Sequence, residues 1–375
     1  MYRDHTVGVV VPAYNEAGFV GTTIDTIPDY VDRVYVVDDA STDGTWSEVA
    51  EHAEAVNRFV MPEAPAFDVR VVPIRHRENR GVGGAIKTGY LRARDDGLDV
   101  TAVMGGDNQM NPAELHRYLD PIVAGDADYV KGSRFLRPED SADMPRFRLL
   151  GNVLLSYLTK VASGYWAVLD PQNGYTAISL SALRRADVEE MYEYYGYCND
   201  LLVKLNVEDL RVADVPRSSS FAYDDGWKSH IDYAEYVPRV STMLARNFFG
   251  RLNEKYLFRR FHPLALFYYL GVGLAGAGVV RALGARLRGL REGAGGTDQR
   301  GGGQLRTILT GAVLFLYAAV LDAEDNRELQ LQVRGDPARD HEPSEVAAGK
   351  PGVEPENGEK PAADEPIATD WGAGP

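Results

Sequence analysis

The sequence contains a single cysteine, Cys198, in 375 residues. One thiol can form no disulfide within the chain, and it supplies too few ligands for a cysteine-based metal cluster. Cys198 is therefore expected in the core or in the wall of a pocket. The chain also lacks an N-terminal basic segment followed by a long apolar run, so no secretory signal is predicted and its start is expected in the cytoplasm.

Lysine is scarce as well, since only 8 of the 40 basic residues are Lys. The 55 acidic residues give a formal net charge of −15, and such a surface repels the phosphates of nucleic acids. Nucleic acid is therefore not expected as a partner. High acidity with little Lys favours a proteome adapted to high salt, and a GC-rich genome is the alternative explanation.

What the chain does have is a series of short β-branched runs that alternate with helix-like stretches. This alternation predicts an α/β fold with a mostly parallel central sheet covered on both faces. Ligands of such sheets bind beyond the carboxyl ends of the strands, where the acidic and Gly-rich clusters of this sequence fall. The predicted strands are 7–11, 33–37, 69–74, 100–104 and 129–130, and the clearest helix is 84–98.

Composition divides the chain into four parts. Residues 1–235 are predicted to form the α/β domain, and the aromatic, basic residues 236–261 are typical of an amphipathic segment at a membrane interface. Within 262–329 lie two apolar runs, and residues 330–375, acidic and nearly without large apolar side chains, are predicted to be a disordered tail.

The two apolar runs, about 264–283 and 305–321, predict a membrane hairpin. A helix of twenty residues reaches roughly 30 Å, which is enough to cross a bilayer. A buried core helix is the alternative for the first run. The connecting region carries Arg286, Arg288, Arg291 and Arg300, which fit poorly outside the cytoplasm if both flanks lie inside. Shallow insertion would remove this conflict, and the topology stays open.

Two acidic clusters follow predicted strands. Asp38 and Asp39 open the stretch DDASTDGT, where an acid can accept hydrogen bonds from a base or ribose, although a helix-capping turn is the alternative. Asp107 and Gln109 lie in GGDNQM and offer oxygen ligands to Mg²⁺ or Mn²⁺ that also holds a diphosphate. A plain Asp-Asn turn is the alternative there.

A Gly-rich stretch lies between these clusters, at the start of the predicted helix. Gly81 belongs to it and Lys87 follows, so backbone amides can approach a phosphate at this helix start. The stretch matches neither the full Walker pattern nor a strict dinucleotide fingerprint. By itself it does not decide between nucleotide binding and a simple helix entry.

Taken in order, the motifs VVVPAYNE, VVDDASTDGT, NRGVGGAIKTG, GGDNQM and KGSRF resemble the family 2 glycosyltransferases of GT-A fold. The resemblance is strongest to dolichyl-phosphate mannose and glucose synthases, and the composition fits a haloarchaeal type. It implies an inverting transfer of a hexose from a UDP- or GDP-sugar to dolichyl or polyprenyl phosphate, and it suggests protein N-glycosylation as the setting. It further implies a cell-membrane enzyme whose catalytic domain faces the cytoplasm.

The resemblance also implies roles for particular residues. The nucleotide pocket would be lined by Pro12, Tyr14, Glu16, Asp38 and Asp39, with Gly81 and Lys87 near the phosphates. Asp107 and Gln109 would contact the metal, Arg134 and Arg148 would hold the acceptor phosphate, and Asp200 would assist with positioning. An acceptor phosphate is already anionic near neutral pH, so the transfer needs no strong general base. Charge and placement would carry the catalysis.

Two positions depart from the family pattern. The relatives usually have D-x-D-x-Q, whereas Gly105 replaces the first Asp, which removes one carboxylate ligand and predicts weaker metal binding. Cys198 stands where an acid is common. A catalytically impaired paralogue that serves as a membrane scaffold therefore stays an alternative, as does a glycosyltransferase whose acceptor is a lipid-linked or other saccharide. Either arginine of the acceptor site could instead be a structural salt-bridge partner.

Overall fold

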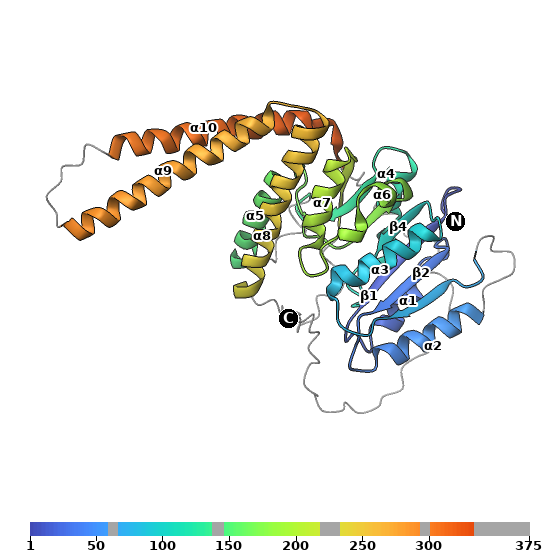
Figure 1. The fold of residues 1–375 in the computed structure, drawn as a ribbon. Helices are drawn as coiled ribbons and strands as arrows, with labels where there is room; N and C mark the ends of the chain where they lie inside the picture. The colour runs from blue at the N-terminus through green and yellow to red at the C-terminus, as the bar shows by residue number, and fades with distance from the viewer. Residues whose placement is uncertain (59–66, 137–145, 218–232, 293–300, 334–375) are drawn as a thin grey trace.

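The computed structural model describes residues 1–58, 67–136, 146–217, 233–292 and 301–333 (Figure 1). It shows an α/β domain from which two long helices extend as an arm. The predicted strands and the predicted helix are all present, and their ends differ from the expected ones by a few residues. The predicted α/β class is therefore confirmed.

A single eight-stranded sheet forms the centre of the domain, in the order β3-β2-β1-β4-β6-β5-β7-β8. β6 pairs antiparallel with β4 and β5, while the other pairings are parallel. The carboxyl ends of the parallel strands thus share one edge. The strands are β1 (Val7–Ala13), β2 (Arg33–Asp38), β3 (Val71–Arg75), β4 (Val100–Val103), β5 (Tyr129–Ser133), β6 (Thr176–Ser179), β7 (Val212–Pro216) and β8 (Gln330–Gln332).

Helices cover both faces of the sheet, as the fully buried strand β1 requires. Val9 and Val11 pack into the core on one face, whereas Val10 packs into the core on the other, because successive side chains of a strand point to opposite sides. The helices of the domain are α1 (Val20–Thr26), α2 (Thr45–Arg58), α3 (Gly81–Asp95), α4 (Leu115–Val123), α5 (Arg146–Ser163), α6 (Leu180–Arg185) and α7 (Tyr197–Val207), with short 3₁₀ turns at Pro112–Glu114, Val188–Glu190 and Arg327–Leu329.

The arm consists of α9 (Leu264–Glu292) and α10 (Gly301–Asp325), which pack along each other. Glycine allows their close approach: a Cβ added at Gly271 would lie 2.8 Å from the Phe315 amide nitrogen. Both helices contain a stretch long and apolar enough to cross a membrane, Leu264–Leu287 and Gly302–Asp325. They are longer than the predicted runs, since α9 continues past Leu283 and α10 already includes the last glycines of the expected loop.

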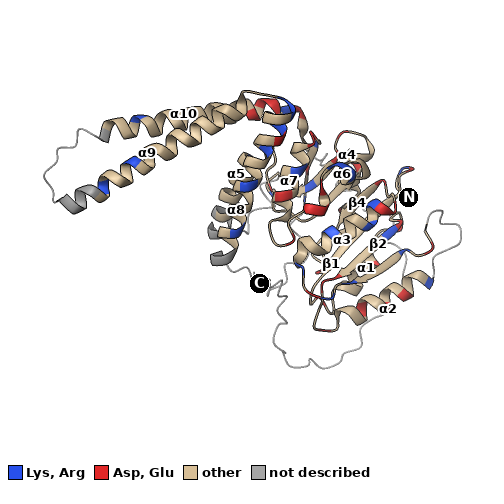
Figure 2. Ribbon diagram, in the orientation of Figure 1, with Lys and Arg blue, Asp and Glu red and all other residues tan. Residues whose placement is uncertain are grey.

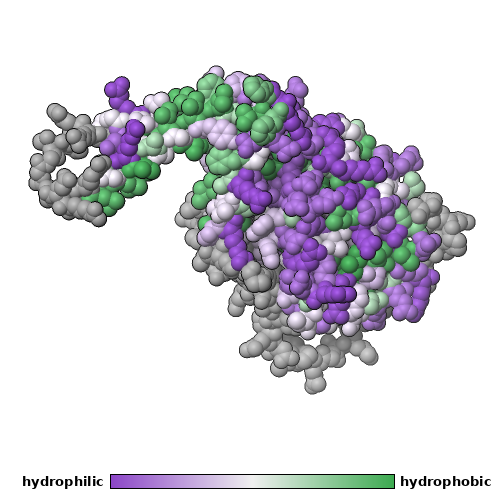
Figure 3. Space-filling model, viewed as in Figure 1, coloured by the Kyte–Doolittle hydropathy of each residue, from purple (hydrophilic) through white to green (hydrophobic). Residues whose placement is uncertain are grey.

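Apolar side chains form patches along the face of the arm seen in Figure 3, while charged residues gather where the arm meets the domain (Figure 2). Exposed apolar side chains at about half or more of their surface recur along both helices. They include Leu266, Leu270, Val280, Leu283, Leu287, Leu305, Leu309, Val313, Leu316 and Val320.

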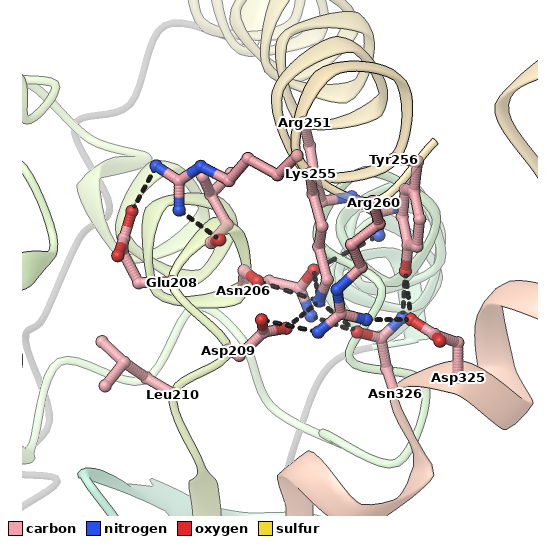
Figure 4. Close-up of polar contacts among 12 residues, drawn as sticks. Asn206, Glu208, Asp209, Leu210, Arg251, Lys255, Tyr256, Arg260, Asp325 and Asn326 are labelled. Carbon is pink, nitrogen blue, oxygen red and sulfur yellow. Dashed lines mark hydrogen bonds and ion pairs between the residues drawn. The ribbon is translucent and has the colours of Figure 1, made fainter. Parts of the chain in front are cut away.

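A buried polar cluster, here called the joint, connects the arm to the domain. α8 (Tyr233–Arg251) continues as a π-helix over Leu252–Arg259, and both lie within the predicted amphipathic segment apart from the first residues of α8. Arg251 donates to both carboxylate oxygens of Asp322 in α10 at 2.9 and 2.8 Å, and both side chains are fully buried. Lys255 donates to the side chains of Asn206 and Asn326 (Figure 4). Two basic residues of the segment thus face inward rather than a lipid surface.

The chain returns to the sheet after the arm. Gln330–Gln332 forms β8 beside β7, and the Ala167 amide bonds the Gln330 side chain. The first residues of the predicted disordered tail, 330–375, are therefore ordered, because Gln330–Gln332 forms the outermost strand of the sheet. Residues 334–375 lie outside the described residues.

Candidate active site

The candidate site lies where the strands end, at the edge that the sequence predicts. The GGDNQM loop is tied to the end of β1, because the Gly106 amide donates to the Pro12 carbonyl at 3.1 Å. Pro12 is buried and Tyr14 is half-buried just beyond it. The first and fourth strands thereby bring two of the predicted motifs together.

Glu16 is buried beside this loop, with 4% of its surface exposed. Its backbone amide donates to Thr45 Oγ1 at 2.8 Å, which fixes the turn after β1 against the start of α2. Burial, together with the charges of Asp107 and Asp43, raises the pKa of Glu16 to about 9. Glu16 and Asp107 are therefore near enough to repel each other as anions, and a bound cation would relieve that repulsion.

Asp38 and Asp39 are both fully buried and both are engaged by neighbouring groups. Asp38 pairs with Arg75 at 3.1 Å. Asp39 contacts His76 Nδ1 at 2.6 Å and accepts a bond from the Arg80 amide at 3.0 Å, so it fixes the loop that leads into α3. An open hollow beside them is lined by Ala40, Arg75, His76 and Arg77.

Gly81 is the first residue of α3, and Lys87 lies six residues further along the same helix. Gly81 has φ +79°, and a Cβ there would approach the Glu193 carbonyl oxygen to 2.7 Å, so glycine is required for two reasons. The Lys87 ammonium pairs with the Glu193 carboxylate at 2.5 Å and donates to the Glu189 carbonyl. Lys87 therefore holds α3 against this segment.

Asp107 and Gln109 lie in a turn after β4. The Gln109 amide donates to Asp107 Oδ1 at 3.1 Å, and Asn108 between them adopts φ +55°, which Asn tolerates. Burial raises the pKa of Asp107, while the Gln109 amide and the charge of Arg217 lower it. The part of the chain described here holds no cluster of three His, Cys, Asp or Glu side chains around a metal position. Asp107 and Gln109 offer two oxygen ligands, which fits a cation that is also held by diphosphate and water.

Arg134 follows β5 and is held by a fully buried carboxylate. Its Nε and Nη2 donate to the two oxygens of Asp170 at 2.7 and 3.0 Å. Burial would raise the pKa of Asp170, but the charge and hydrogen bonds of Arg134 and the charge of Lys131 together hold it below its usual value. The bidentate pair fixes the plane of the guanidinium. Arg148 belongs to α5, but its side chain lies outside the described residues.

Asp200 is buried in α7, where burial raises its pKa. It accepts bonds from the Tyr192 amide at 2.9 Å and from the Asn247 side chain at 2.6 Å, so it connects α7 with α8. Cys198 is buried, as expected, and its thiol lies 3.5 Å from the Asn173 carbonyl oxygen.

Arg217 is a site residue that the sequence did not single out. It directly follows β7, and its guanidinium donates to the Asn173 side chain at 3.2 Å and to the Gln109 carbonyl at 3.4 Å. The signal available in the sequence was an arginine one residue after a β-branched run, which on its own is too common to identify a site.

Comparisons with known proteins agree with this arrangement. Residues 8–188 match the family model for glycosyl transferase family 2. The chain is 30% identical over 214 residues to the UDP-N-acetylglucosamine--dolichyl-phosphate N-acetylglucosaminyltransferase of Methanococcus voltae, covering 57% of this chain and 85% of that protein.

Two bacterial relatives are similar over comparable lengths. Identity is 28% over 213 residues to the undecaprenyl-phosphate mannosyltransferase of Micrococcus luteus, covering 55% of this chain and 80% of that protein. Identity is 30% over 199 residues to the polyprenol monophosphomannose synthase of Mycolicibacterium smegmatis, covering 51% of this chain and 67% of that protein. These relatives, the motifs in their order and the sheet with its acidic edge confirm the GT-A expectation, and the chain belongs to glycosyl transferase family 2 as a glycosyltransferase.

Proposed function

We propose that this protein transfers a hexose or a related sugar from a nucleoside-diphosphate donor to a polyprenyl or dolichyl phosphate at a membrane. The relatives named above act on such lipid phosphates by their names. The structural observation that carries the proposal is the Arg134–Asp170 pair. It places a guanidinium of fixed orientation at the same sheet edge as Asp107, the residue proposed to face the donor.

In this proposal the donor occupies the edge formed by β1, β2 and β4. Pro12, Tyr14 and Glu16 line its nucleotide portion, with Asp38 and Asp39 fixing the neighbouring loops. Mg²⁺ or Mn²⁺ bound by Asp107 and Gln109 would neutralise charge on the diphosphate. Gly81 begins α3 directly after the loop that Asp39 fixes, so its backbone would approach the phosphates. Lys87 would bind them as well if it left Glu193.

The acceptor phosphate would lie beside Arg134, with Arg148 as a second cation. One phosphate oxygen attacks the anomeric carbon and forms the new C–O bond. The bond from that carbon to the diphosphate oxygen breaks, and its electron pair leaves with the nucleoside diphosphate. The attack from the opposite side inverts the anomeric centre. No proton must be removed from an anionic phosphate, so Asp200, engaged with α8, acts in positioning only.

A membrane location suits both the arm and the acceptor. The apolar surface of α9 and α10 would insert into lipid, and α5 adds exposed apolar residues on the domain itself. The active site would then open toward the cytoplasm, where nucleotide sugars are made. The exposed side chains of α5 are Val153, Leu154, Tyr157 and Leu158.

A saccharide acceptor is the second candidate, since a neutral hydroxyl would need a general base. Burial and the charges of Asp107 and Asp43 raise the pKa of Glu16 to about 9, but Glu16 is on the donor side, near Asp107. Asp200 uses both carboxylate oxygens in bonds to its own chain. Among the described residues, the geometry therefore favours the phosphate acceptor.

The test uses membranes that contain the full-length protein. Polyprenyl phosphate, Mn²⁺ and a panel of radiolabelled UDP- and GDP-sugars are incubated at molar salt, and label in the organic phase is counted. Label is expected with one donor, and it should disappear in Arg134→Ala but persist in Arg211→Ala, which removes a partly exposed arginine at the other end of β7. A folded protein that yields no label with any donor would overturn the proposal.

A further inference from the structure

Arg217 is placed at the sheet edge by the backbone. Its amide donates to the Ser133 carbonyl at 3.2 Å, so the pairing of β5 with β7 continues one residue beyond Pro216. This register sets Arg217 opposite the end of β5, next to Arg134. Gly132 provides the room, because a Cβ there would lie 3.2 Å from the Cβ of Arg217.

The side chain of Arg217 reaches toward the GGDNQM loop. It donates to the Gln109 carbonyl at 3.4 Å, in the same turn where the Gln109 amide donates to Asp107. These two residues are the proposed metal ligands. The positive charge of Arg217 thus lies where a donor diphosphate would bind. Its two hydrogen bonds, at 3.2 and 3.4 Å, go to neutral oxygens and are long, so an anion would compete for it effectively.

Asn173 connects this cation to the acceptor side. Its Oδ1 accepts bonds from Arg217 and from the Tyr175 amide, while its Nδ2 donates to Asp170 at 3.4 Å. Asp170 in turn holds Arg134. Hydrogen bonds through Asn173 and Asp170 therefore connect two guanidinium groups. Arg217 lies toward Asp107, and Arg134 lies toward the proposed acceptor phosphate.

Because position 105 is a glycine, a protein cation such as Arg217 matters more for binding the diphosphate. A carboxylate there would help to hold a divalent metal, and without it the metal has fewer anionic ligands. We propose that Arg217 binds the donor diphosphate directly, so that nucleoside diphosphates bind this site in the absence of divalent metal. In the transfer reaction, the same contact stabilises the departing diphosphate. This inference rests on the proposed function only in requiring a diphosphate donor.

The test is a binding measurement on the full-length protein in detergent, with UDP, UMP, GDP and GMP as probes. Calorimetric titrations are made in EDTA and again with Mn²⁺, for the wild type, Arg217→Gln and Arg211→Gln. Arg211 precedes β7 and Arg217 follows it, so the control removes an arginine from the same strand at the opposite end. Thermal unfolding of each variant accompanies the titrations.

In EDTA, the wild type should bind one diphosphate more tightly than the matching monophosphate. Arg217→Gln should lower that preference by about tenfold, the size of one charge-assisted hydrogen bond, and Arg211→Gln should leave it unchanged. A residue that only anchors the chain would change the unfolding temperature but would not change the diphosphate preference.

Equal preference in the wild type and Arg217→Gln would overturn the inference, and so would a wild type that binds diphosphates only with Mn²⁺. Both outcomes leave the proposed function standing, because the donor still binds. A wild type that binds none of these nucleotides even with Mn²⁺ would instead contradict the proposed function, and the inference with it.

Discussion

The joint and the active-site edge both concentrate charge inside the protein, but they satisfy it differently. In the joint, Arg251 and Asp322 meet in a bidentate pair that is fully buried. At the active-site edge, the acids Glu16 and Asp107 lie near each other, and burial raises the pKa of each. The joint is complete without a ligand, whereas the edge would gain stability from a bound cation.

This difference separates charges that hold the fold from charges that bind a ligand. A buried ion pair whose partners are all supplied by the chain fixes the position of the arm. Buried acids that repel each other reduce stability, and they are common where proteins bind cations or substrates. Arg217 has features of both kinds of charge. Its long hydrogen bonds to neutral groups hold the side chain in place, but they do not neutralise its charge.

The largest effect is expected from breaking the joint. Arg251→Met leaves Asp322 buried without its partner, so we expect a loss of roughly 3–5 kcal/mol in the free energy of unfolding. Chemical denaturation of the purified protein measures it. The control Arg327→Met removes an arginine from an exposed pair and should change stability by less than about 1 kcal/mol.

A double variant sharpens this test. Arg251→Met combined with Asp322→Leu removes both charges and should recover much of the lost stability. If the double variant is as unstable as Arg251→Met alone, the loss does not come from an unpaired carboxylate.

The next effect concerns the active-site edge. Asp107→Asn keeps the size of the side chain but removes its charge, so sugar transfer should fall on the order of 10²-fold or more while the unfolding temperature holds or rises. Asp126→Asn, in an exposed loop, is the control. Transfer that survives in Asp107→Asn would show that this carboxylate does not hold the donor.

Restoring the missing acid should produce a gain. A Cβ at Gly105 would lie 2.9 Å from Asp107 Oδ1, so Gly105→Asp needs only a small shift of a carboxylate end. We expect Mn²⁺ to bind about tenfold more tightly, because the site gains an anionic ligand. Titration of Mn²⁺ by electron paramagnetic resonance measures it, with Gly105→Asn as the uncharged control. Equal affinity in both variants would contradict the role of charge.

The smallest effect is a pH dependence within the joint. The pKa of Lys255 is lowered from 10.5 to about 8, because burial outweighs the opposing hydrogen bond and charge of Asp209. Between these values the unfolded chain holds a proton that the folded chain lacks, so the contribution of Lys255 to stability rises with pH, by at most about 1.4 kcal/mol per pH unit. The difference in unfolding free energy between the wild type and Lys255→Met should therefore grow from about pH 8 to about pH 9.5. A constant difference would contradict the lowered pKa.

The sheet could be predicted from the sequence where strands are short, β-branched and buried, as in β1 and β2. Such runs also show which residues follow the strand ends. Asp38 and Asp107 follow two predicted parallel strands, so they could be placed at one edge of the sheet. β8 was missed because Gln330–Gln332 is three residues long and has one apolar side chain, too little for a strand pattern. Its pairing with β7 depends on the arm returning the chain to the sheet.

Side-chain partners could not be predicted in the same way. The basic character of 236–261 suggested a lipid surface, yet Arg251 and Lys255 turn inward because Asp322, Asn206 and Asn326 arrive from distant parts of the chain. Arg217 was missed for the same reason, since its relation to Gln109 and Asn173 exists only once β4 and β7 are in place.

The most direct test of the proposed reaction compares two acceptors that differ only in the phosphate. Membranes containing the protein are given the radiolabelled donor with polyprenyl phosphate or with the corresponding free polyprenol. The account predicts labelled lipid with the phosphate alone, released as sugar by mild acid, and none in Arg134→Ala. Equal labelling of the free alcohol, or labelling only of an added lipid-linked saccharide, would contradict it.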